Sequence, residues 1–428
     1  MSWIPAAVMF GLFAANIPVA FAIAMAALSF FLMVQGTQPE ALIQRLVSVT
    51  QSFPLLAIPF FIFLGVVIHH GGMGRRIMNL ADTFAGHMIG GLAQVNVLLA
   101  TLMAGMSGSS TAEAAMQCKI LVPEMSRRGY DKAFSVAVTA CSALIATMIP
   151  PSIGLILYGV LADVSIGRLF VAGIIPGVLL AALFSGYIIV WALAHPEKIP
   201  AVTARTTIAE KLYASRHLIP VMLLIALVLG SIYVGVATAT EAAAFGVVGS
   251  LIISATQSSL TRKTFFDSMM GATRLYCMIA LILSGAAFLT LAMGYIGLPR
   301  HLAEWIGSLG LTPFALVVAL TAFYIVLGCF LDGISMVVLT MGVILPTVEK
   351  AGIDLLWFGI FIVLVVEMAQ VTPPVGFNLF VLQGMTGKQI TWIARHTLPM
   401  FLLMVVAVML IWFVPDLITF LPRQMKMG

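Results

Sequence analysis

Two Pro-Pro pairs interrupt the chain at corresponding places. Pro150-Pro151 and Pro373-Pro374 lie 223 residues apart, and each pair stands inside a long apolar run. The same offset relates further prolines and glycines of the two halves: Pro123 to Pro346, Gly129 to Gly352 and Pro176 to Pro399. The chain is therefore an internal duplication. Two interrupted membrane helices at matching positions of the halves indicate the binding site of a secondary transporter.

The composition indicates a membrane protein. Of the 428 residues, 61% are hydrophobic and 9% are charged, whereas a soluble domain has roughly 25% charged residues. A helix needs about 20 apolar residues to cross the hydrocarbon core, and stretches of this length recur along the chain. We therefore predict an all-α polytopic membrane protein. The net charge of +5 is modest and implies no nucleic-acid partner.

Two further apolar stretches, residues 91–123 and 314–346, carry polar or glycine residues at their midpoints. Each could be a spanning helix with a kink at small residues. Each could instead be a re-entrant hairpin, because irregular backbone is allowed at membrane depth where protein or a water-filled cavity surrounds it.

The positions of Lys and Arg predict how these hairpins face. Cytoplasmic loops collect basic residues, and four loops do so here, at 75–76, 127–132, 198–216 and 262–274. With these loops in the cytoplasm, the first hairpin opens to the cytoplasm and the second to the opposite side. The two repeats are then inverted in topology.

This interpretation divides the chain into five parts. We expect N-terminal scaffold helices over residues 1–70 and central scaffold helices over 177–275. Each repeat has an arm, a hairpin and a Pro-Pro-broken helix, and the repeats cover residues 71–176 and 276–399. Residues 400–428 form a C-terminal helix. Amphipathic stretches within residues 69–90 and 297–310 are expected to lie along the membrane surface.

The hairpin tips and helix breaks carry the chemistry. The first half has a small, hydroxyl-rich tip at 105–111 and a break at 149–152, and the second half has a tip at 328–333 and a break at 371–378. A tip exposes the free N–H groups of one arm and the free C=O groups of the other, which can bind a carboxylate and a cation. Proline also frees carbonyls of the preceding turn, and these suit a small cation such as Na⁺. The structural alternative for residues 105–111 is a close-packing motif of small residues.

One motif is compatible with an enzyme. Gly105-Met106-Ser107-Gly108 fits the G-x-S-G pattern around the nucleophile of intramembrane serine proteases. Such a nucleophile needs a base within hydrogen-bond reach, and all seven histidines lie at segment ends or in connecting stretches. The protease stays as the enzymatic alternative, and a transporter is preferred.

Few charged side chains lie deep in apolar sequence, namely Glu113, Glu241, Asp332 and Glu367. Such residues are functional candidates because their burial is costly. Glu113 and Asp332 lie beside the tips and are the charged candidates for the site. Glu241 stands among threonines, whose hydroxyls are expected to satisfy it.

Together these stretches resemble the large membrane (M) subunit of the tripartite ATP-independent periplasmic transporters, the TRAP family. The resemblance covers nearly the whole chain and is most specific at residues 105–115, 129–177 and 352–376. One departure is Ala239, where family members usually have proline.

The resemblance implies an elevator mechanism, in which a transport domain with both hairpins and both broken helices slides against a scaffold, driven by Na⁺ influx. It implies a bacterial or archaeal multi-pass protein of the cytoplasmic (inner) membrane, in contact with membrane lipids. Two partners are implied: a small four-helix membrane subunit (Q type), expected as a separate chain, and a periplasmic substrate-binding protein (P type). That protein would deliver an organic acid such as a C4-dicarboxylate or sialic acid. The rival is a stand-alone carboxylate symporter driven by Na⁺ or H⁺.

The family's sites can be carried over by motif. The resemblance places one Na⁺ site between Ser107, Ser110, Ile149 and Ser152, and the other between Gly328, Leu331, Thr372 and Val375, mostly through backbone carbonyls. For the substrate we expect Ser109, Ser110, Thr111 and Asn378. No organic cofactor is expected, and because no G-x-x-x-x-G-K-[ST] run is present, the energy must come from an ion gradient.

Overall fold

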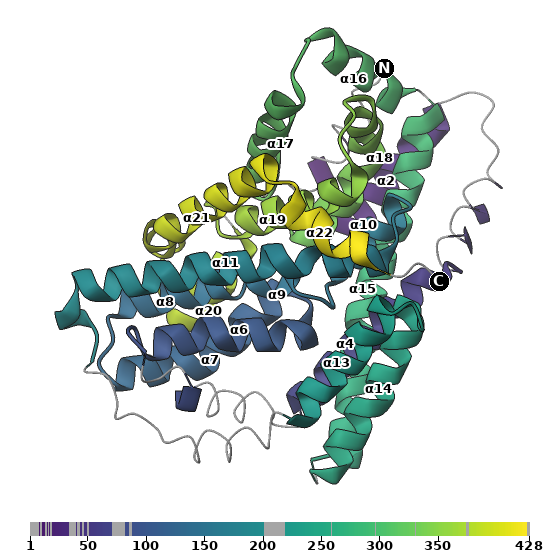
Figure 1. The fold of residues 1–428 in the computed structure, drawn as a ribbon. Helices are drawn as coiled ribbons and strands as arrows, with labels where there is room; N and C mark the ends of the chain where they lie inside the picture. The colour runs from purple at the N-terminus through teal and green to yellow at the C-terminus, as the bar shows by residue number, and fades with distance from the viewer. Residues whose placement is uncertain are drawn as a thin grey trace.

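The computed structural model describes residues 19–33, 51–70, 82–84, 88–200, 219–257, 259–295, 297–329, 331–373 and 376–425, with isolated positions before residue 51. Within these ranges every regular element is a helix (Figure 1). The predicted all-α fold is therefore confirmed. Five helices are long and apolar enough to cross a membrane, and a pair bent by 43° makes a sixth in the same residues: Ile166–Ala194, Ala239–Thr256, Arg262–Tyr295, Gly333–Lys350, Ile390–Phe413, and Lys132–Met148 with Ile153–Leu161.

The internal duplication is visible in the helices. The first repeat contains α6 (Leu92–Ser107), α7 (Ser110–Arg127), α8 (Lys132–Ser142), α9 (Ile145–Met148), α10 (Ile153–Leu161) and α11 (Ile166–Ala194). The second contains α17 (Pro313–Leu327), α18 (Gly333–Lys350), α19 (Leu355–Gln370), α20 (Phe377–Thr386) and α21 (Ile390–Phe413). Shifting the bounds of α7 by 223 residues gives those of α18, so the two hairpins start their second arms at equivalent positions.

The repeated glycine and aspartate between these helices act as a stop and a start. Gly129 after α7 and Gly352 after α18 both have positive φ, +91° and +72°, which glycine adopts without a Cβ clash at a helix C-terminus. Two residues later, Asp131 accepts the Phe134 N–H at 2.9 Å and Asp354 accepts the Trp357 N–H at 2.8 Å. Each aspartate is therefore the N-cap of its broken helix.

Helices outside the two repeats form a second group. It comprises α2 (Val19–Met33), η1 (Phe53–Leu56), α4 (Ala57–His70), α13 (Ile219–Tyr233), α14 (Ala239–Thr256) and α15 (Arg262–Tyr295). Helix α15 packs on α2 and α4, and α14 packs on α4 and α13; Figure 1 shows α4, α13 and α14 side by side at the lower right. Glycine makes the close contacts, since a Cβ on Gly246 of α14 would lie 2.4 Å from Leu64 Cδ1.

The two repeats contact each other through α10 and α20, the helices that follow the two breaks. Helix α10 packs on α18 of the second hairpin, and α20 packs on α7 of the first. These two contacts are related by the 223-residue offset, so each broken helix supports the other repeat's hairpin. Figure 1 shows α20 among α6, α7 and α8, beneath the long α11.

Some expected boundaries fall inside helices. Helices α11, α15 and α21 run without interruption through residues 176, 275 and 399, so the five-part division does not separate whole helices. After α21 the chain turns at Pro415 into α22 (Asp416–Gln424), so the described part of residues 400–428 holds two helices where one was expected. The stretch 297–310 is the helix α16 (Leu298–Ser308), whereas most of 69–90 lies outside the described residues. The short η2 (Pro196–Lys198) follows α11.

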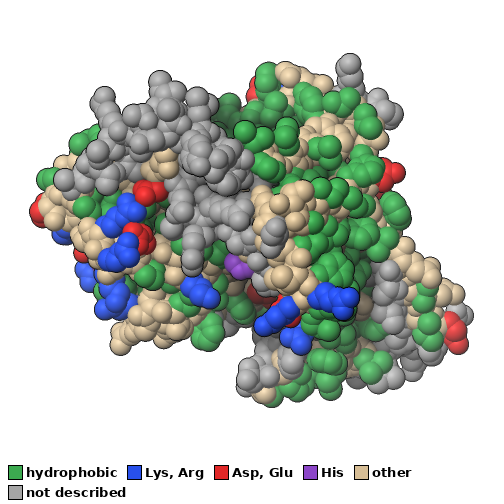
Figure 2. Space-filling view, turned by 90° about the horizontal axis from the view of Figure 1, so that it is seen from below, with side chains coloured by type: hydrophobic (Ala, Val, Ile, Leu, Met, Phe, Trp, Pro, Cys, Tyr) green, Lys and Arg blue, Asp and Glu red, His purple; other side chains and the backbone are tan. Residues whose placement is uncertain are grey.

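The surface agrees with a membrane environment. Figure 2 shows one face on which hydrophobic side chains cover wide areas and Lys and Arg gather in local groups. On α14 the side chains of Phe245, Val248 and Ile252 are more than half exposed. Such a surface is stable where lipid covers it.

Candidate functional site

The first hairpin turns at its predicted tip. Gly108, with φ +57°, ends α6, Ser109 is extended, and α7 starts at Ser110. A Cβ on Gly108 would lie 3.1 Å from the Pro151 carbonyl oxygen and 3.3 Å from Ile153 Cγ1. The tip therefore lies directly against the first helix break.

The second hairpin repeats this arrangement. A Cβ on Gly328 would lie 2.2 Å from the Cβ of Ala369, in the last turn of α19. The Cys329 thiol donates a hydrogen bond to the Pro373 carbonyl oxygen at 3.2 Å. The second tip thus lies against the second break.

Backbone groups at both breaks leave the regular helical pattern. Ile149 ends α9 with ψ 126°, and the buried Ser152 accepts the Leu155 N–H at 3.3 Å as the N-cap of α10. In the second break the Thr372 hydroxyl donates to the Met368 carbonyl oxygen at 2.9 Å. A Cβ on Gly376, whose φ is +46°, would lie 2.8 Å from the Thr372 carbonyl oxygen. Of the eight expected Na⁺ ligands, the side chain of Ser107 and the whole of Val375 lie outside the described residues.

The expected substrate residues come together from the two halves. The Thr111 hydroxyl donates to Asn378 Oδ1 at 2.8 Å. Asn378 is fully buried and its Nδ2 has no hydrogen-bond partner within the described residues. Ser110 is buried as well, whereas Ser109 and Thr111 are partly exposed. The two halves of the chain therefore meet at the residues that we expected to bind the substrate.

The charged candidates have local partners. Asp332 accepts the N–H groups of Ile334 at 3.1 Å and Ser335 at 3.2 Å, together with the Ser335 hydroxyl, so it is the N-cap of α18. Glu113, fully buried, accepts the Gln117 amide at 2.7 Å. Glu241 forms a capping box with Thr238, which confirms that local hydroxyls satisfy it.

Two more residues belong to this region: Glu367, which the sequence named as a functional candidate but assigned to no site, and Gln370, which it did not name. Glu367 is 5% exposed, and its carboxyl group interacts with the hydroxyls of Ser110 and Thr147. Gln370 is 2% exposed, and neither of its amide atoms has a hydrogen-bond partner in the described part of the chain. One sequence signal relates Gln370 to this region: it lies 223 residues after Thr147, which is the offset of the internal duplication.

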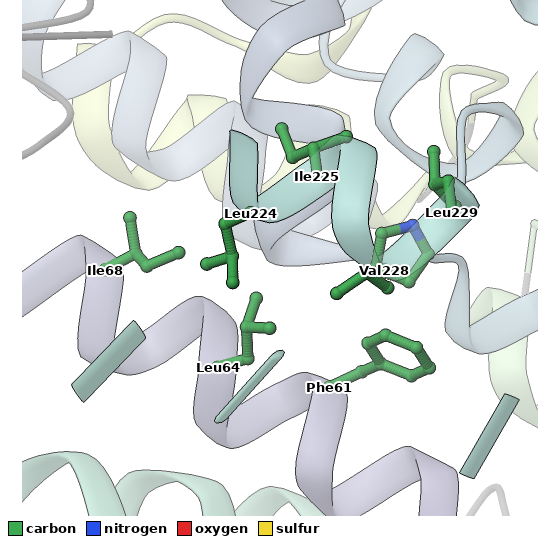
Figure 3. A pocket seen from close by; sticks show the side chains of 8 residues that line it. Phe61, Leu64, Ile68, Leu224, Ile225, Val228 and Leu229 are labelled. Carbon is green, nitrogen blue, oxygen red and sulfur yellow. The ribbon is translucent and has the colours of Figure 1, made fainter. Parts of the chain in front are cut away.

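The first break also rests on the second helix group. Pro151 reaches a small apolar pocket between α4 and α13. Figure 3 shows Phe61, Leu64 and Ile68 of α4 facing α13 across it. A larger groove of about 1060 Å³ runs between the α10–α11 loop, the α13–α14 loop and α22, and Arg168 and Arg423 line it. The small pocket thus lies between the first break and α13, and the groove lies beside the loop that follows α13.

Comparison with known proteins decides the family. Residues 6–417 match the family model described as the DctM component of the tripartite ATP-independent periplasmic transporter. The chain belongs to this family. It is a large TRAP membrane subunit, which confirms the resemblance seen in the sequence, and it is a multi-pass membrane protein.

Three relatives of the DctM family illustrate the range of named substrates. The C4-dicarboxylate large permease protein DctM of Pseudomonas aeruginosa is 30% identical over 385 residues, covering 90% of both chains. The sialic acid permease protein SiaT of Haemophilus influenzae is 31% identical over 95% of this chain and 66% of its own length. The isethionate permease protein DctMQ of Oleidesulfovibrio alaskensis is 32% identical over 96% and 65%. The chain thus spans about two thirds of the last two. All three are named as transporter permeases, which favours transport over the protease alternative.

The fold has a solved counterpart. The crystal structure of the Alcanivorax borkumensis YdaH transporter superposes with a TM-score of 0.64, covering 96% of this chain and 99% of that chain. The sequence identity is 13%, so the match shows a shared fold.

Proposed function

We propose that the chain is the large permease subunit of a Na⁺-driven transporter that imports an organic acid across the inner membrane. The hydrogen bond between Thr111 and Asn378 carries this proposal, because it joins the N-terminal turns of α7 and α20, one from each half. A site built at this contact is shared by both repeats, as discontinuous helices build it in secondary transporters.

The acid group of the substrate would bind at these two helix N-termini. Among the described residues, no side chain caps α7, whose N-cap is Ser109, or α20, whose N-cap is Gly376. Free N–H groups at a helix N-terminus, with the positive end of the helix dipole, attract a carboxylate or sulfonate. The unpartnered Nδ2 of Asn378 supplies a further donor. The relatives named for C4-dicarboxylates, sialic acid and isethionate agree with an organic acid as substrate.

The coupling Na⁺ ions would bind where each tip meets its break. Ile149 leaves the helical pattern two residues before Pro151, which faces Gly108, and Thr372 does so three residues after Ala369, which faces Gly328. Their carbonyl groups are therefore suitable hard ligands. Buried polar atoms without partners, such as those of Gln370, fit a region that holds ions or water. Bound Na⁺ would then hold each tip on its break.

The partners and the motion complete the proposal. A small membrane subunit and a periplasmic binding protein would work with this chain, and the helices with both tips would slide as an elevator against α2, α4, α13, α14 and α15. The alternative is a symporter that needs no binding protein.

Uptake into proteoliposomes tests this function. The chain is reconstituted with its small subunit and binding protein and offered succinate, N-acetylneuraminate or isethionate under an inward Na⁺ gradient. We expect uptake of one acid with Na⁺ and none with K⁺. Asn378→Ala and Thr111→Ala should lose that uptake. The control is Glu349→Gln, which removes an exposed carboxylate and should keep the uptake. Na⁺-driven uptake by the chain alone would favour the stand-alone symporter, and uptake that ignores the Na⁺ gradient would contradict the proposal.

A further inference from the structure

Glu367 stands between the two repeats. It lies on α19 one turn before the second break, where α19 contacts the second hairpin. That contact is made by Ala369 against Gly328 and by Val366 against Gly333, where an added Cβ would lie 3.0 Å from Val366 Cγ1. The Glu367 carboxyl group instead interacts with the first repeat, at the Ser110 and Thr147 hydroxyls.

The hydrogen bonds around this carboxyl group are incomplete. An ionised carboxylate only accepts hydrogen bonds, and the Thr147 hydroxyl already donates to the Leu144 carbonyl oxygen at 3.0 Å. Glu367 Oε2 has no partner in the described residues, and none of the ion pairs formed there includes Glu367. A buried charge without a counter-charge is costly. The three side chains therefore offer hard oxygen ligands in one buried region, which suits a bound cation.

We call the contact of each hairpin tip with its helix break a junction. The second junction lacks a charged residue equivalent to Glu367. The 223-residue offset relates Ser110 to Gly333 and Thr147 to Gln370, and it relates Leu144 to Glu367. Gln370 indeed lies beside Gly333, with Nε2 3.4 Å from where a Cβ on this glycine would be. At the position equivalent to Glu367, however, the first repeat has the buried, apolar Leu144. The two junctions are therefore chemically unequal.

We propose that Glu367 is an anionic ligand of the first Na⁺ site and reaches it from the opposite repeat. This inference rests on the proposed Na⁺ coupling. The site then combines a carboxylate oxygen with the Ser110 and Thr147 hydroxyls and the carbonyl groups of the first break, all hard oxygen ligands. Because the ligands come from both repeats, Na⁺ at this site ties the first hairpin to α19.

Thermal stability of the purified, detergent-solubilised chain tests the assignment. The unfolding midpoint is measured in increasing NaCl, with KCl keeping the ionic strength constant, for the wild type, Glu367→Gln and Glu349→Gln. A ligand that binds only the folded state raises the midpoint. We expect Glu367→Gln to need about tenfold more NaCl for half of the rise, and Glu349→Gln to match the wild type. In KCl alone, Glu367→Gln should be the more stable protein, because it removes an uncompensated buried charge.

The outcomes separate the two proposals. An equal NaCl requirement in the wild type and Glu367→Gln overturns the assignment and leaves Na⁺ coupling intact. A variant that is less stable in both salts with an unchanged NaCl requirement shows a structural role and also overturns it. If Na⁺ has no effect on the wild type, the Na⁺ coupling is contradicted, and this site with it. Should Glu367→Gln not fold, Ser110→Ala and Thr147→Val are expected to raise the NaCl requirement in the same way, and unchanged values would overturn the assignment.

Discussion

Two glycines fix how each hairpin tip meets its helix break. Gly108 has a left-handed φ and faces the Pro151 carbonyl oxygen, and Gly328 touches Ala369 so closely that no side chain fits. The sequence predicted both tips because small residues interrupt apolar arms. It could not predict the neighbours of Glu367, because α19 faces both hairpins and only its rotation in the fold decides which side chain faces Ser110.

Replacing Gly328 with leucine tests the second junction. The side chain would collide with Ala369 and push the tip from α19, since even a Cβ would lie 2.2 Å from the Ala369 Cβ. We expect Gly328→Leu to raise the NaCl concentration for half-maximal stabilisation by about tenfold or more. Thr372→Ala keeps the backbone carbonyl and should change it by less than about threefold. A Gly328 variant with wild-type Na⁺ affinity would contradict the second site.

Helix starts and stops are the elements that the duplication predicts best. Gly129 and Gly352 end the hairpins, and Asp131 and Asp354 cap the broken helices, all from one repeated local pattern. The packing of α10 on α18 and of α20 on α7 could not be predicted, because no local signal states which repeat a half-helix contacts. The end of α21 at Phe413 was also missed, since the apolar sequence continues past Pro415 into α22.

Removing either aspartate cap should destabilise the chain to a similar degree. Asp131→Ala and Asp354→Ala each lose one side-chain bond to a backbone N–H at a helix start. Such a loss costs about 0.5–2 kcal/mol, which we expect to lower the thermal unfolding midpoint in detergent. Glu349→Ala, which removes an exposed carboxylate at the end of α18, is the matched control. A midpoint that falls for only one of the two caps would contradict their equivalence.

The two repeats act as one unit because their contacts cross between them. Thr111 meets Asn378, Glu367 meets Ser110 and Thr147, and α10 and α20 each support the opposite hairpin. Around this unit, α4 and α13 contact the first break through the apolar pocket of Figure 3. Such apolar contacts suit two groups of helices that move past each other, as the proposed elevator requires.

The central claim is that bound Na⁺ holds each hairpin tip against its helix break. The reactivity of the Cys329 thiol tests this claim most directly. This thiol bonds the Pro373 carbonyl oxygen inside the second junction, Cys118 and Cys141 are buried, and the exposed Cys277 can be replaced by serine. The measurement is the rate at which N-ethylmaleimide modifies Cys329 in the Cys277→Ser chain, in NaCl and in KCl at equal ionic strength. We predict that NaCl slows the reaction by about fivefold or more, because Na⁺ raises the fraction of molecules in which the second tip contacts its break and covers Cys329. Equal rates in the two salts, with the chain folded in both, would contradict the account.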